Sequence, residues 1–444
     1  MKDNNIETRK IYFISFGCKV NQYETECMKQ DFEAEGFRTT ETESEADVFV
    51  INSCTVTATG DKKMKQTLRR LRSEYPCSLI VLSGCYPQAF KTEAEKLDEA
   101  DIVTGTKNRR KVVELVKQRI ESDARIISVD DFEKGDVFEK SLCHGFTSKT
   151  RAFVKIQDGC NRFCTYCIIP YSRGRIRSKP IEDIKTEIKE LAEKGYKEIV
   201  LVGINLAFYG AEFGLRLADA VEVCCKTDGV ERVRLGSLEP EVITDEDLDR
   251  LAKLPEFCPH FHLSLQSGCD KTLKAMNRAY TTEEYSELMG RIRSRFENCS
   301  FTTDIMVGFP DETEEDFVKS MEFVKKAGFA KVHIFPYSRR EGTPASRMKN
   351  QITKAEKHSR VKRMEQVSEE IRHNFLESQV GKEVPVLFER ETTPEFHQGH
   401  SPNYTLIKIP SKSDKKSLRK QIFCVKIKSA GNDCCFGEIS GTLP

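Results

Sequence analysis

The sequence contains no run of apolar residues that approaches the roughly 18 needed for a membrane-spanning helix. Met1–Lys10 is polar and has no apolar core of the kind found in secretory signals. No charge of one sign dominates, because 71 Lys and Arg balance 70 Asp and Glu to a formal net charge of +1. These absences predict a cytoplasmic protein with no membrane contact, in which any nucleic-acid surface is built from local clusters of Lys and Arg.

Cysteine, by contrast, is frequent. The 17 cysteines are spread through a long chain in which 32% of the residues are charged, and this pattern favours reduced thiols and metal ligation over a disulfide scaffold. A chain of 444 residues with 38% hydrophobic residues can form two or three domains with ordinary cores. The adjacent pairs Cys224–Cys225 and Cys434–Cys435 are not expected to be ligands, since adjacent cysteines rarely bind one metal together.

Three cysteines fall within eight residues, at Cys160, Cys164 and Cys167. Thiolates are the standard ligands of iron–sulfur clusters, and a C-x3-C-x2-C run can hold three corners of a cubane while the fourth iron stays open to a small molecule. A structural zinc site needs four closed ligands, and no histidine or fourth cysteine stands nearby. The spacing therefore predicts an iron–sulfur cluster; three buried cysteines adjacent by chance is the alternative.

A second set of three cysteines follows strand-like runs in the first part of the chain. Apolar runs alternate there with amphipathic helical patterns, which predicts a parallel sheet of βα units. The runs Ile11–Phe16, Val48–Ile51 and Leu79–Leu82 are each followed within a few residues by a cysteine. If the strands are parallel neighbours, these thiols converge beyond the carboxyl ends, where open α/β sheets bind ligands. The cysteines are Cys18, Cys54 and Cys85.

The helix after the first strand has a start signal and a stop signal. Asn21 is predicted as its N-cap, with Glu24 three residues later as in a capping box. Gly36 is predicted to end it. Residues 121–145 are polar and have no sustained apolar period, and they are predicted to form a linker.

Six further strand candidates, separated by helical patterns, follow from Arg151 onward. Repeated βα units curl into a barrel, and six units rather than eight predict a partial, open one. The run that begins at Cys160 follows the first of these strands, at the place of a βα loop on the carboxyl-terminal face. The candidates are Ala152–Ile156, Glu198–Val202, Arg232–Leu235, Phe261–Leu265, Phe301–Val307 and Lys331–Phe335.

The last part of the chain changes character. A long charged helix is predicted over Lys354–Ser378, with an apolar stripe that packs in the core. Short β-rich runs over Val380–Pro444 then predict a small barrel. Its basic cluster forms either a solvated loop or a contact to an RNA backbone. The cluster consists of Lys412, Lys415, Lys416, Arg419 and Lys420.

Several motifs resemble those of the radical S-adenosylmethionine (SAM) methylthiotransferases, over nearly the whole chain. The order of a three-cysteine domain, a radical SAM domain and a terminal barrel similar to the TRAM domain is that of this family. Phe16–Gln22 resembles the branch that acts on threonylcarbamoyladenosine in tRNA, since the isopentenyladenosine branch usually has Gln-Met where Lys19 and Val20 stand. The other matching motifs are Asp158–Cys167, Pro170–Arg175, His262–Gly268 and Tyr337–Ala345.

The resemblance implies an α/β fold in three parts. An N-terminal parallel-sheet domain at 8–120 would carry an auxiliary cluster. After the linker, a partial (β/α)6 radical SAM barrel would span 146–378. A small C-terminal β-barrel, the RNA-binding TRAM domain, would span 379–444.

The same resemblance implies the chemistry. The cysteines at 160, 164 and 167 would hold the 4Fe-4S cluster that cleaves SAM, and those at 18, 54 and 85 a second 4Fe-4S cluster that carries the sulfur to be inserted. The expected reaction methylthiolates carbon 2 of N6-threonylcarbamoyladenosine next to the anticodon, on the tRNA anticodon stem-loop. An electron donor such as flavodoxin or ferredoxin and a sulfur donor are the other expected partners.

Other site residues are implied less directly. Six positions are candidates for the SAM pocket, with ordinary packing or a turn as the alternative for each. Arg173, Arg175 and Arg177 would neutralise either the SAM carboxylate or tRNA phosphate. Two positions depart from the family: Asp311 stands where glycine is usual, which predicts a different turn, and Asn205 where histidine is common. The SAM-pocket candidates are Tyr166, Gly203, Asn205, Ser237, Glu239 and Gln266.

Two other functions compete with this one. The same chemistry on isopentenyladenosine in tRNA or on a ribosomal-protein side chain is one alternative, and the Lys19–Val20 pair argues against it. A non-catalytic, metal-bearing RNA-binding protein is the other. The intact second cysteine triad argues against that function, because a binding module needs no two open clusters.

Overall fold

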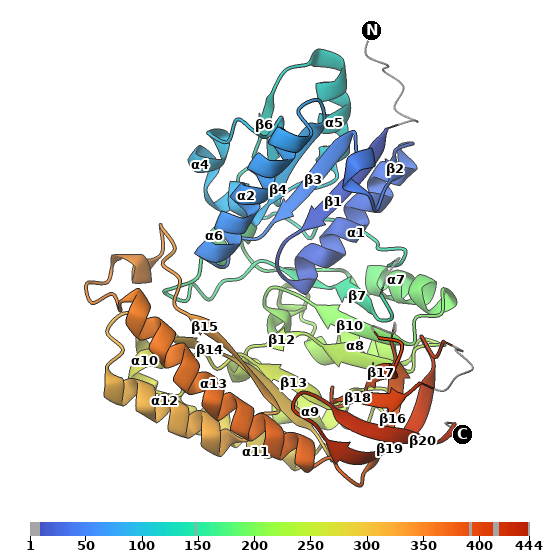
Figure 1. Cartoon of the computed structure of the whole chain (residues 1–444), viewed down its shortest axis with the longest axis vertical. Helices are drawn as coiled ribbons and strands as arrows, with labels where there is room; N and C mark the ends of the chain where they lie inside the picture. Colours follow the sequence, from blue (N-terminus) through green and yellow to red (C-terminus); the bar gives the residue numbers. More distant parts are fainter. Residues whose placement is uncertain (1–8, 147–148, 390–392, 412–416, 443–444) are drawn as a thin grey trace. The chain divides into compact units, whose positions relative to one another are not determined.

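The computed structural model describes residues 9–146, 149–389, 393–411 and 417–442. Within these ranges the chain forms two compact units (Figure 1). The first combines Met1–Phe146 with the later segments Lys155–Lys179 and Ser338–Ser346, and the second comprises Thr147–Val154, Pro180–Tyr337 and Arg347–Pro444. No helix among the described residues has both the length and the apolar character needed to cross a bilayer.

The first unit contains a parallel six-stranded sheet in the order β2-β1-β3-β4-β5-β6. Three of its strands confirm the predicted apolar runs, and β1, β3 and β4 are direct neighbours. The strands are β1 (Lys10–Ser15), β2 (Arg38–Thr39), β3 (Val48–Ser53), β4 (Leu79–Gly84), β5 (Ile102–Thr104) and β6 (Ile126–Ser128). The helices are α1 (Lys19–Ala34), η2 (Glu43–Glu45), α2 (Ala58–Glu74), α3 (Cys85–Ala89), α4 (Lys91–Glu95) and α5 (Lys111–Ser122).

Both faces of this sheet are covered, because side chains alternate along a strand. Phe49 and Ile51 of β3 pack on one face in the core that also holds Leu68 of α2. Val48 and Val50 of the same strand point to the other face, in the core formed with α1 and α5. A sheet covered on both sides is typical of parallel βα folds.

Helix α1 begins earlier than its capping signal predicts. Cys18 is the N-cap residue, and its side chain makes no capping hydrogen bond. Asn21 and Glu24 lie inside the helix and are buried. The predicted N-cap is therefore wrong, because these two side chains bind buried partners from other parts of the chain. The predicted stop is confirmed: Gly36 has φ +89° and its N–H donates to the carbonyl of Glu33.

The cysteine run at 160–167 belongs to the first unit. It lies between two short antiparallel strands, β8 (Gln157–Asp158) and β9 (Arg177–Ser178), and is followed by helix α6 (Ile169–Arg173). All six cysteines of the two triads are consequently in one compact unit.

The second unit contains the predicted partial barrel. Its strands form two sheets, β11-β10-β7 and β12-β13-β14-β15, and only Gly236 separates β11 from β12. The pairs β10–β11, β12–β13, β13–β14 and β14–β15 are parallel. All six predicted strands are confirmed to within two residues. They are β7 (Ala152–Lys155), β10 (Glu198–Val202), β11 (Arg232–Leu235) with β12 (Ser237–Leu238), β13 (His260–Leu263), β14 (Ser300–Val307) and β15 (Lys331–Pro336).

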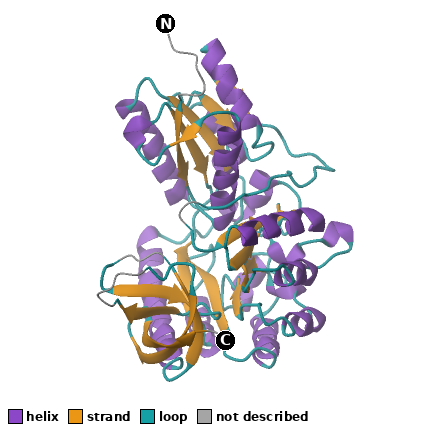
Figure 2. Cartoon of the chain, turned by 90° about the vertical axis from the view of Figure 1, so that its right-hand side faces the viewer, coloured by secondary structure: helices purple, strands orange, loops and turns teal. Residues whose placement is uncertain are grey.

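Helices alternate with these strands along the chain. Figure 2 shows the helices in purple and the strands in orange. The longest is α13, at Lys354–Glu377, and it confirms the predicted charged helix. Met364 and Ile371 of its stripe are buried. The others in this unit are α7 (Ile181–Glu193), η3 (Leu206–Phe208), η4 (Ala211–Phe213), α8 (Leu217–Cys225), η5 (Pro240–Val242), α9 (Asp245–Leu251), α10 (Asp270–Ala275), α11 (Thr282–Arg293) and α12 (Glu314–Ala327). The short η6 (Pro344–Arg347) begins in the segment that belongs to the first unit.

The terminal segment forms a closed five-stranded barrel in the order β16-β17-β18-β20-β19. Of the predicted basic cluster, Lys412, Lys415 and Lys416 lie outside the described residues. Arg419 donates to the carbonyl of Lys149, and the Lys420 ammonium lies 4.0 Å from the centre of the Tyr196 ring. The strands are β16 (Glu383–Phe388), β17 (Phe396–His400), β18 (Leu406–Pro410), β19 (Ile422–Ala430) and β20 (Cys435–Thr442).

Two buried arginines of β11 join the two barrels of the second unit. Arg232 donates to the carbonyls of His400 and Pro385, at 2.9 and 2.8 Å. Arg234 donates to the carbonyl of Pro402 at 2.7 Å and to the Glu198 carboxylate at 2.8 Å. The small barrel therefore supplies backbone acceptors for cations of the larger one.

Candidate functional site

The second cysteine triad lies at one edge of the parallel sheet. Cys18, Cys54 and Cys85 follow the carboxyl ends of β1, β3 and β4, which are neighbours in the sheet. Burial, together with the thiols of Cys85 and Cys18, raises the pKa of the Cys54 thiol to about 12. The pKa of Cys85 is raised in the same way, first by burial and also by the Cys18 thiol. The three side chains are thus near enough to repel one another as thiolates.

Two glycines allow this approach. Gly17 has φ +98°, and a Cβ on it would lie 2.4 Å from the Cβ and 2.7 Å from the Sγ of Cys54. Gly84 has φ +100°, and a Cβ on it would lie 2.4 Å from the carbonyl oxygen of Ser53. A side chain at either position would push the strand ends apart.

Backbone hydrogen bonds shape the loop of the first triad. The N–H of Cys160 donates to the carbonyl of Gly174, at 3.0 Å, and that of Cys167 to the carbonyl of Cys164, at 2.9 Å. The N–H of Arg162 points at the Sγ of Cys160, at 3.4 Å. A Cβ on Gly159 would lie 1.8 Å from the carbonyl oxygen of Arg175, so the loop closes tightly behind its first cysteine.

A buried group of charges in the first unit contacts Cys85 of the second triad and Gly159, the residue before Cys160. Glu24 and Asp158 are its carboxylates, and Lys155 donates to both, at 2.6 and 2.5 Å. Arg173 donates to Glu24 through Nη1 at 2.6 Å and through Nη2 at 2.9 Å. Burial raises the pKa of Glu24, but Arg109, Arg173 and Lys155 outweigh it and lower this pKa to about 2.

These contacts correct the prediction for two of the three arginines after the cysteine run. Arg173 is 1% exposed and Arg177 is 7% exposed. Their charges face Glu24 and Asp158, since Arg177 lies 3.6 Å from the latter. The proposed neutralisation of a SAM carboxylate or tRNA phosphate is therefore wrong for both, whereas Arg175 is exposed.

The segment Ser338–Ser346 connects the loops of both triads. Arg340 donates to Thr55 Oγ1 and to the Asp61 carboxylate, each at 2.6 Å, in the loop and helix after Cys54. The N–H of Ala345 donates to the carbonyl of Thr165, between Cys164 and Cys167, at 2.8 Å. The sequence analysis identified Tyr337–Ala345 as a family motif, but the sequence did not indicate that this motif contacts both triad loops.

The donor set fits two iron–sulfur clusters. None of the 17 cysteines, which all lie in the described ranges, forms a disulfide. Within the described part of the chain, no three His, Cys, Asp or Glu side chains are grouped to hold a single metal ion. Each triad offers three thiols on loops whose shape glycines set, and thiolates are the ligands that such clusters take. Cys224, Cys225, Cys434 and Cys435 are buried in α8 and beside or within β20.

Four of the six SAM-pocket candidates follow strands of the partial barrel, and a fifth lies in one of its strands. Gly203 and Asn205 come after β10, and Asn205 is only 3% exposed. Ser237 lies in β12, and Glu239 directly follows this strand. Gln266 follows β13, has φ +70° and bridges to β14, since its N–H donates to the carbonyl of Asp304 at 2.8 Å.

Glu239 and Tyr166 have surroundings that differ from those of the other candidates. Glu239 forms an ion pair with the buried Arg278, which also donates to the carbonyl of Ser264. Tyr166, the sixth candidate, is half-buried in the first unit. The carboxyl ends of consecutive barrel strands are where barrels of this kind carry their functional groups.

A histidine and an aspartate on adjacent strands were missed by the sequence reasoning. His262 of β13 contacts Asp304 of β14 through Nε2, at 3.2 Å, and Thr302 through Nδ1, at 2.9 Å. Phe261, next to His262, stacks on Phe301, next to Thr302, and both rings are on the opposite face because side chains alternate along a strand. The family resemblance placed His262 in a motif but did not indicate its partner. The alternation of side chains along both predicted strands is the signal that could have placed His262 and Asp304 on the same face.

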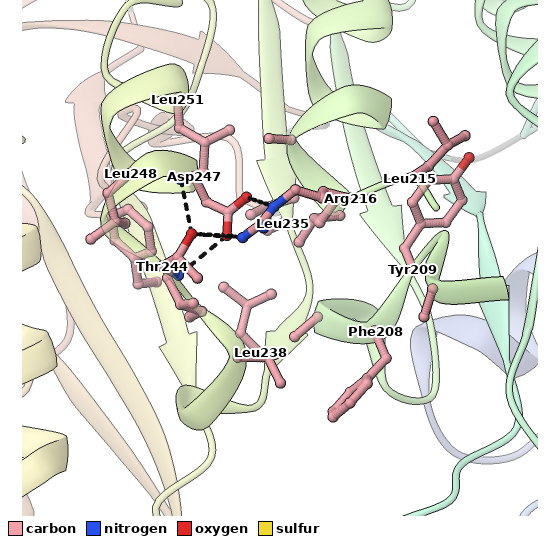
Figure 3. A pocket seen from close by; sticks show the side chains of 17 residues that line it. Phe208, Tyr209, Leu215, Arg216, Leu235, Leu238, Thr244, Asp247, Leu248 and Leu251 are labelled. Carbon is pink, nitrogen blue, oxygen red and sulfur yellow. Dashed lines mark hydrogen bonds and ion pairs between the residues drawn. The ribbon is translucent and has the colours of Figure 1, made fainter. Parts of the chain in front are cut away.

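An apolar cavity of about 310 Å³ lies between the strands β11 and β12 and the helices α8 and α9 (Figure 3). Leu235, Leu238 and Leu248 are among its lining side chains. Its main polar groups, Arg216, Thr244 and Asp247, bind one another. None of the SAM-pocket candidates lines this cavity.

The turn at Asp311 keeps the backbone that glycine would give. Asp311 has φ +66°, in the left-handed region. Its N–H donates to the carbonyl of Asn350 at 3.1 Å, and its carboxylate accepts from the Asn350 side chain. The expected change of turn geometry is therefore wrong, because local hydrogen bonds hold the aspartate in this conformation.

Comparison with known proteins assigns the family. The profile of the Radical SAM superfamily matches residues 154–324, and that of the uncharacterized protein family UPF0004 matches residues 10–105. The radical SAM methyltransferase TsrM from Kitasatospora setae is similar in fold, with a TM-score of 0.55 at 13% identity over 76% of this chain and 74% of TsrM.

Relatives of known name are similar over most of their length. The threonylcarbamoyladenosine tRNA methylthiotransferase MtaB of Bacillus subtilis is 38% identical over 95% of this chain and 94% of its own. MtaB of Aquifex aeolicus is 37% identical, over 85% and 92%. The tRNA-2-methylthio-N(6)-dimethylallyladenosine synthase of Alkaliphilus oremlandii is 36% identical, over 87% and 83%.

The predicted cofactors, two 4Fe-4S clusters and SAM, are those of this group of enzymes, and the predicted α/β architecture with a terminal β-barrel is confirmed. The two profiles together cover both cysteine triads. The chain therefore belongs to the radical SAM tRNA methylthiotransferases.

Proposed function

We propose that this enzyme methylthiolates carbon 2 of N6-threonylcarbamoyladenosine next to the tRNA anticodon. The observation that carries this proposal is the 38% identity to the Bacillus subtilis relative over 95% of the chain. Lys19 and Val20, next to Cys18, favour the same branch. The second candidate substrate is isopentenyladenosine, which is also called dimethylallyladenosine, because a relative with that name is 36% identical.

The cysteines take different roles in this proposal. Cys160, Cys164 and Cys167 would hold the cluster that binds and cleaves SAM. Those at 18, 54 and 85 would hold the auxiliary cluster. When bound, the clusters and SAM supply the one-electron chemistry, the sulfur and the methyl group that protein side chains cannot provide. The SAM-pocket candidates would be Tyr166, Gly203, Asn205, Ser237, Glu239 and Gln266.

The chain itself holds these loops in place. Gly17 and Gly84 keep the strand ends close, and the buried charges fix the segments at either side of the first triad. Arg340 ties the loop after Cys54 to the segment that also binds Thr165. The terminal barrel would contact the tRNA backbone, and a one-electron protein donor such as flavodoxin or ferredoxin and a sulfur donor would complete the set of partners. The domains at 8–120, 146–378 and 379–444 would divide these tasks, with 121–145 between the first two.

The substrate is tested by mass spectrometry of tRNA nucleosides from cells that lack the gene. We expect the 2-methylthio form of threonylcarbamoyladenosine to disappear and the unmodified form to accumulate, while methylthiolated isopentenyladenosine is unchanged. Complementation with the wild-type gene should restore the product, and Cys54→Ala should not. Loss of the isopentenyladenosine product instead would select the second candidate, and unchanged tRNA would exclude both.

The cofactor assignment is tested on the purified protein. Anaerobically reconstituted enzyme should bind about eight irons, as expected for two cubanes. Cys160→Ala should halve this number and abolish SAM cleavage. Replacement of Cys18, Cys54 and Cys85 by alanine should also halve it, but should leave part of the SAM cleavage and remove sulfur insertion. Zinc in place of iron would contradict the assignment.

A further inference from the structure

Arg173 contacts the second cysteine triad from the loop of the first. It lies six residues after Cys167, at the end of α6, and its Nε donates to the Sγ of Cys85 at 3.3 Å. Cys85 is 2% exposed and opens α3. The side chain of a residue in the SAM-cluster loop is therefore a direct neighbour of a thiol of the other triad.

The guanidinium of Arg173 is fixed from all sides. A guanidinium has five N–H donors in a rigid plane. Besides the bond from Nε, Nη1 donates to Glu24 and to Asp158, at 2.6 and 3.3 Å, and Nη2 donates to Asn21 and to Glu24, at 2.7 and 2.9 Å. Five contacts for five donors hold the charge at one position against the sulfur of Cys85.

We propose that Arg173 is a positioning residue that orients the Cys85 thiolate and raises the reduction potential of the cluster held by Cys18, Cys54 and Cys85. This inference rests on the proposed cysteine assignment. It concerns how readily the auxiliary cluster takes up an electron, which the assignment of ligands leaves open.

The physical basis is the charge balance of one-electron reduction. A reductant gives one electron to the cluster, and the cluster becomes more negative by one charge. A fixed cation beside a ligand sulfur in a buried, poorly screened position stabilises the more negative state. Hydrogen bonds to the sulfurs also set the potential of such clusters. Glu24 acts in the opposite sense, since its carboxylate lies against the same guanidinium.

The test isolates the auxiliary cluster in the full-length protein. Cys160, Cys164 and Cys167 are replaced by alanine, the protein is reconstituted, and the cluster is titrated with dithionite while its EPR signal is recorded. In this background Arg173→Met should lower the midpoint potential by at least about 60 mV, which is a tenfold change in the one-electron equilibrium. Arg173→Lys, which keeps the charge, should recover at least half of this shift.

Two further variants separate electrostatics from structural damage. Glu24→Gln removes a negative charge with little change of shape and should raise the potential, a direction that loosened packing does not predict. Arg109→Met is the matched control, because Arg109 pairs with the same carboxylates, Glu24 at 3.2 Å and Asp158 at 3.7 Å, whereas the hydrogen bond to Cys85 comes from Arg173. It should shift the potential by less than half of the change in Arg173→Met.

The outcomes distinguish the two levels of the argument. If the variant that lacks Cys160, Cys164 and Cys167 does not bind about four irons after reconstitution, the cysteine assignment is wrong, and the proposed function falls with it. A loaded cluster whose potential is the same in Arg173→Met, or falls equally in Arg109→Met, would overturn only the role of Arg173. If Arg173→Met does not hold a cluster, Arg173→Lys and Glu24→Gln still decide. A fall of potential in Glu24→Gln would contradict the proposal.

Discussion

The Cβ that Gly17 lacks would lie 2.7 Å from the Sγ of Cys54, so the main chain before one cysteine occupies the space beside the thiol of another. This contact means that the geometry of the second triad depends on a residue that is itself no ligand. A substitution at Gly17 should therefore affect the second triad and leave the first one intact.

Gly17→Ala should reduce the iron content of the reconstituted enzyme by up to about four, because the added methyl displaces Cys54 from its two partners. SAM cleavage should be retained. Gly135→Ala is the matched control: Gly135 has φ +101°, so it pays the same backbone strain, but a Cβ there meets nothing within 4 Å. Equal iron loss in both variants would show that strain, not the contact with Cys54, is responsible.

Arg340→Met should destabilise the protein by about 3 kcal/mol, because it leaves the partly buried Asp61 without its cation. The midpoint of thermal unfolding should fall. Asp61→Asn in the Arg340→Met background should recover part of this loss, since the uncompensated carboxylate is then gone. If the double variant is as unstable as the sum of the single variants, the pair is not coupled.

Stability should depend on pH through Glu198. Burial raises its pKa, but Arg234, Arg151 and Arg232 outweigh burial and lower the pKa from 4.5 to about 2. The stabilisation is therefore fully present above pH 4.5 and is lost as the pH falls towards 2. Thermal midpoints measured across this window should fall less steeply in Glu198→Gln than in the wild type. Glu45→Gln, at an ion pair with Lys10 that is exposed and therefore screened by solvent, should change the slope less than Glu198→Gln does.

Asp311→Gly should be tolerated, whereas Asp311→Ala should cost about 1 to 2 kcal/mol, because alanine must adopt a left-handed backbone without the contact to Asn350. Glycine loses the same contact but adopts the backbone freely. Differential scanning calorimetry of the two variants checks this order. An alanine variant as stable as the glycine variant would show that the turn can rearrange.

Patterns within a few residues predicted the elements well. The strands at Glu198–Val202 and Arg232–Leu235 have the predicted bounds, since each is a compact apolar or alternating run between helical patterns. The placement of Cys18 and Cys54 beyond neighbouring strands also followed from the sequence, because parallel βα units send their loops to one edge.

Partners distant in sequence could not be predicted. Asn21 and Glu24 have the spacing of a capping box, yet Asn21 accepts from Arg173, which lies 152 positions away. Arg340 and Asp61 are 279 positions apart. A local pattern reports only what neighbouring residues can do for one another, and here the fold offered these polar side chains stronger, charged partners.

Arg232 and Arg234 make the larger barrel dependent on the terminal segment, so that removal of this segment should destabilise the rest of the protein. Each is at most 4% exposed, and together they rely on four backbone carbonyls of the segment after Val380. Cutting the chain there would strip two interior cations of their acceptors, at a cost of several kcal/mol. The small barrel stabilises the larger one through these hydrogen bonds, and it is also a candidate RNA contact. Weak tRNA binding by a truncated enzyme would therefore reflect destabilisation of the larger barrel. The contribution of the small barrel to RNA affinity should be measured with surface substitutions instead of truncation.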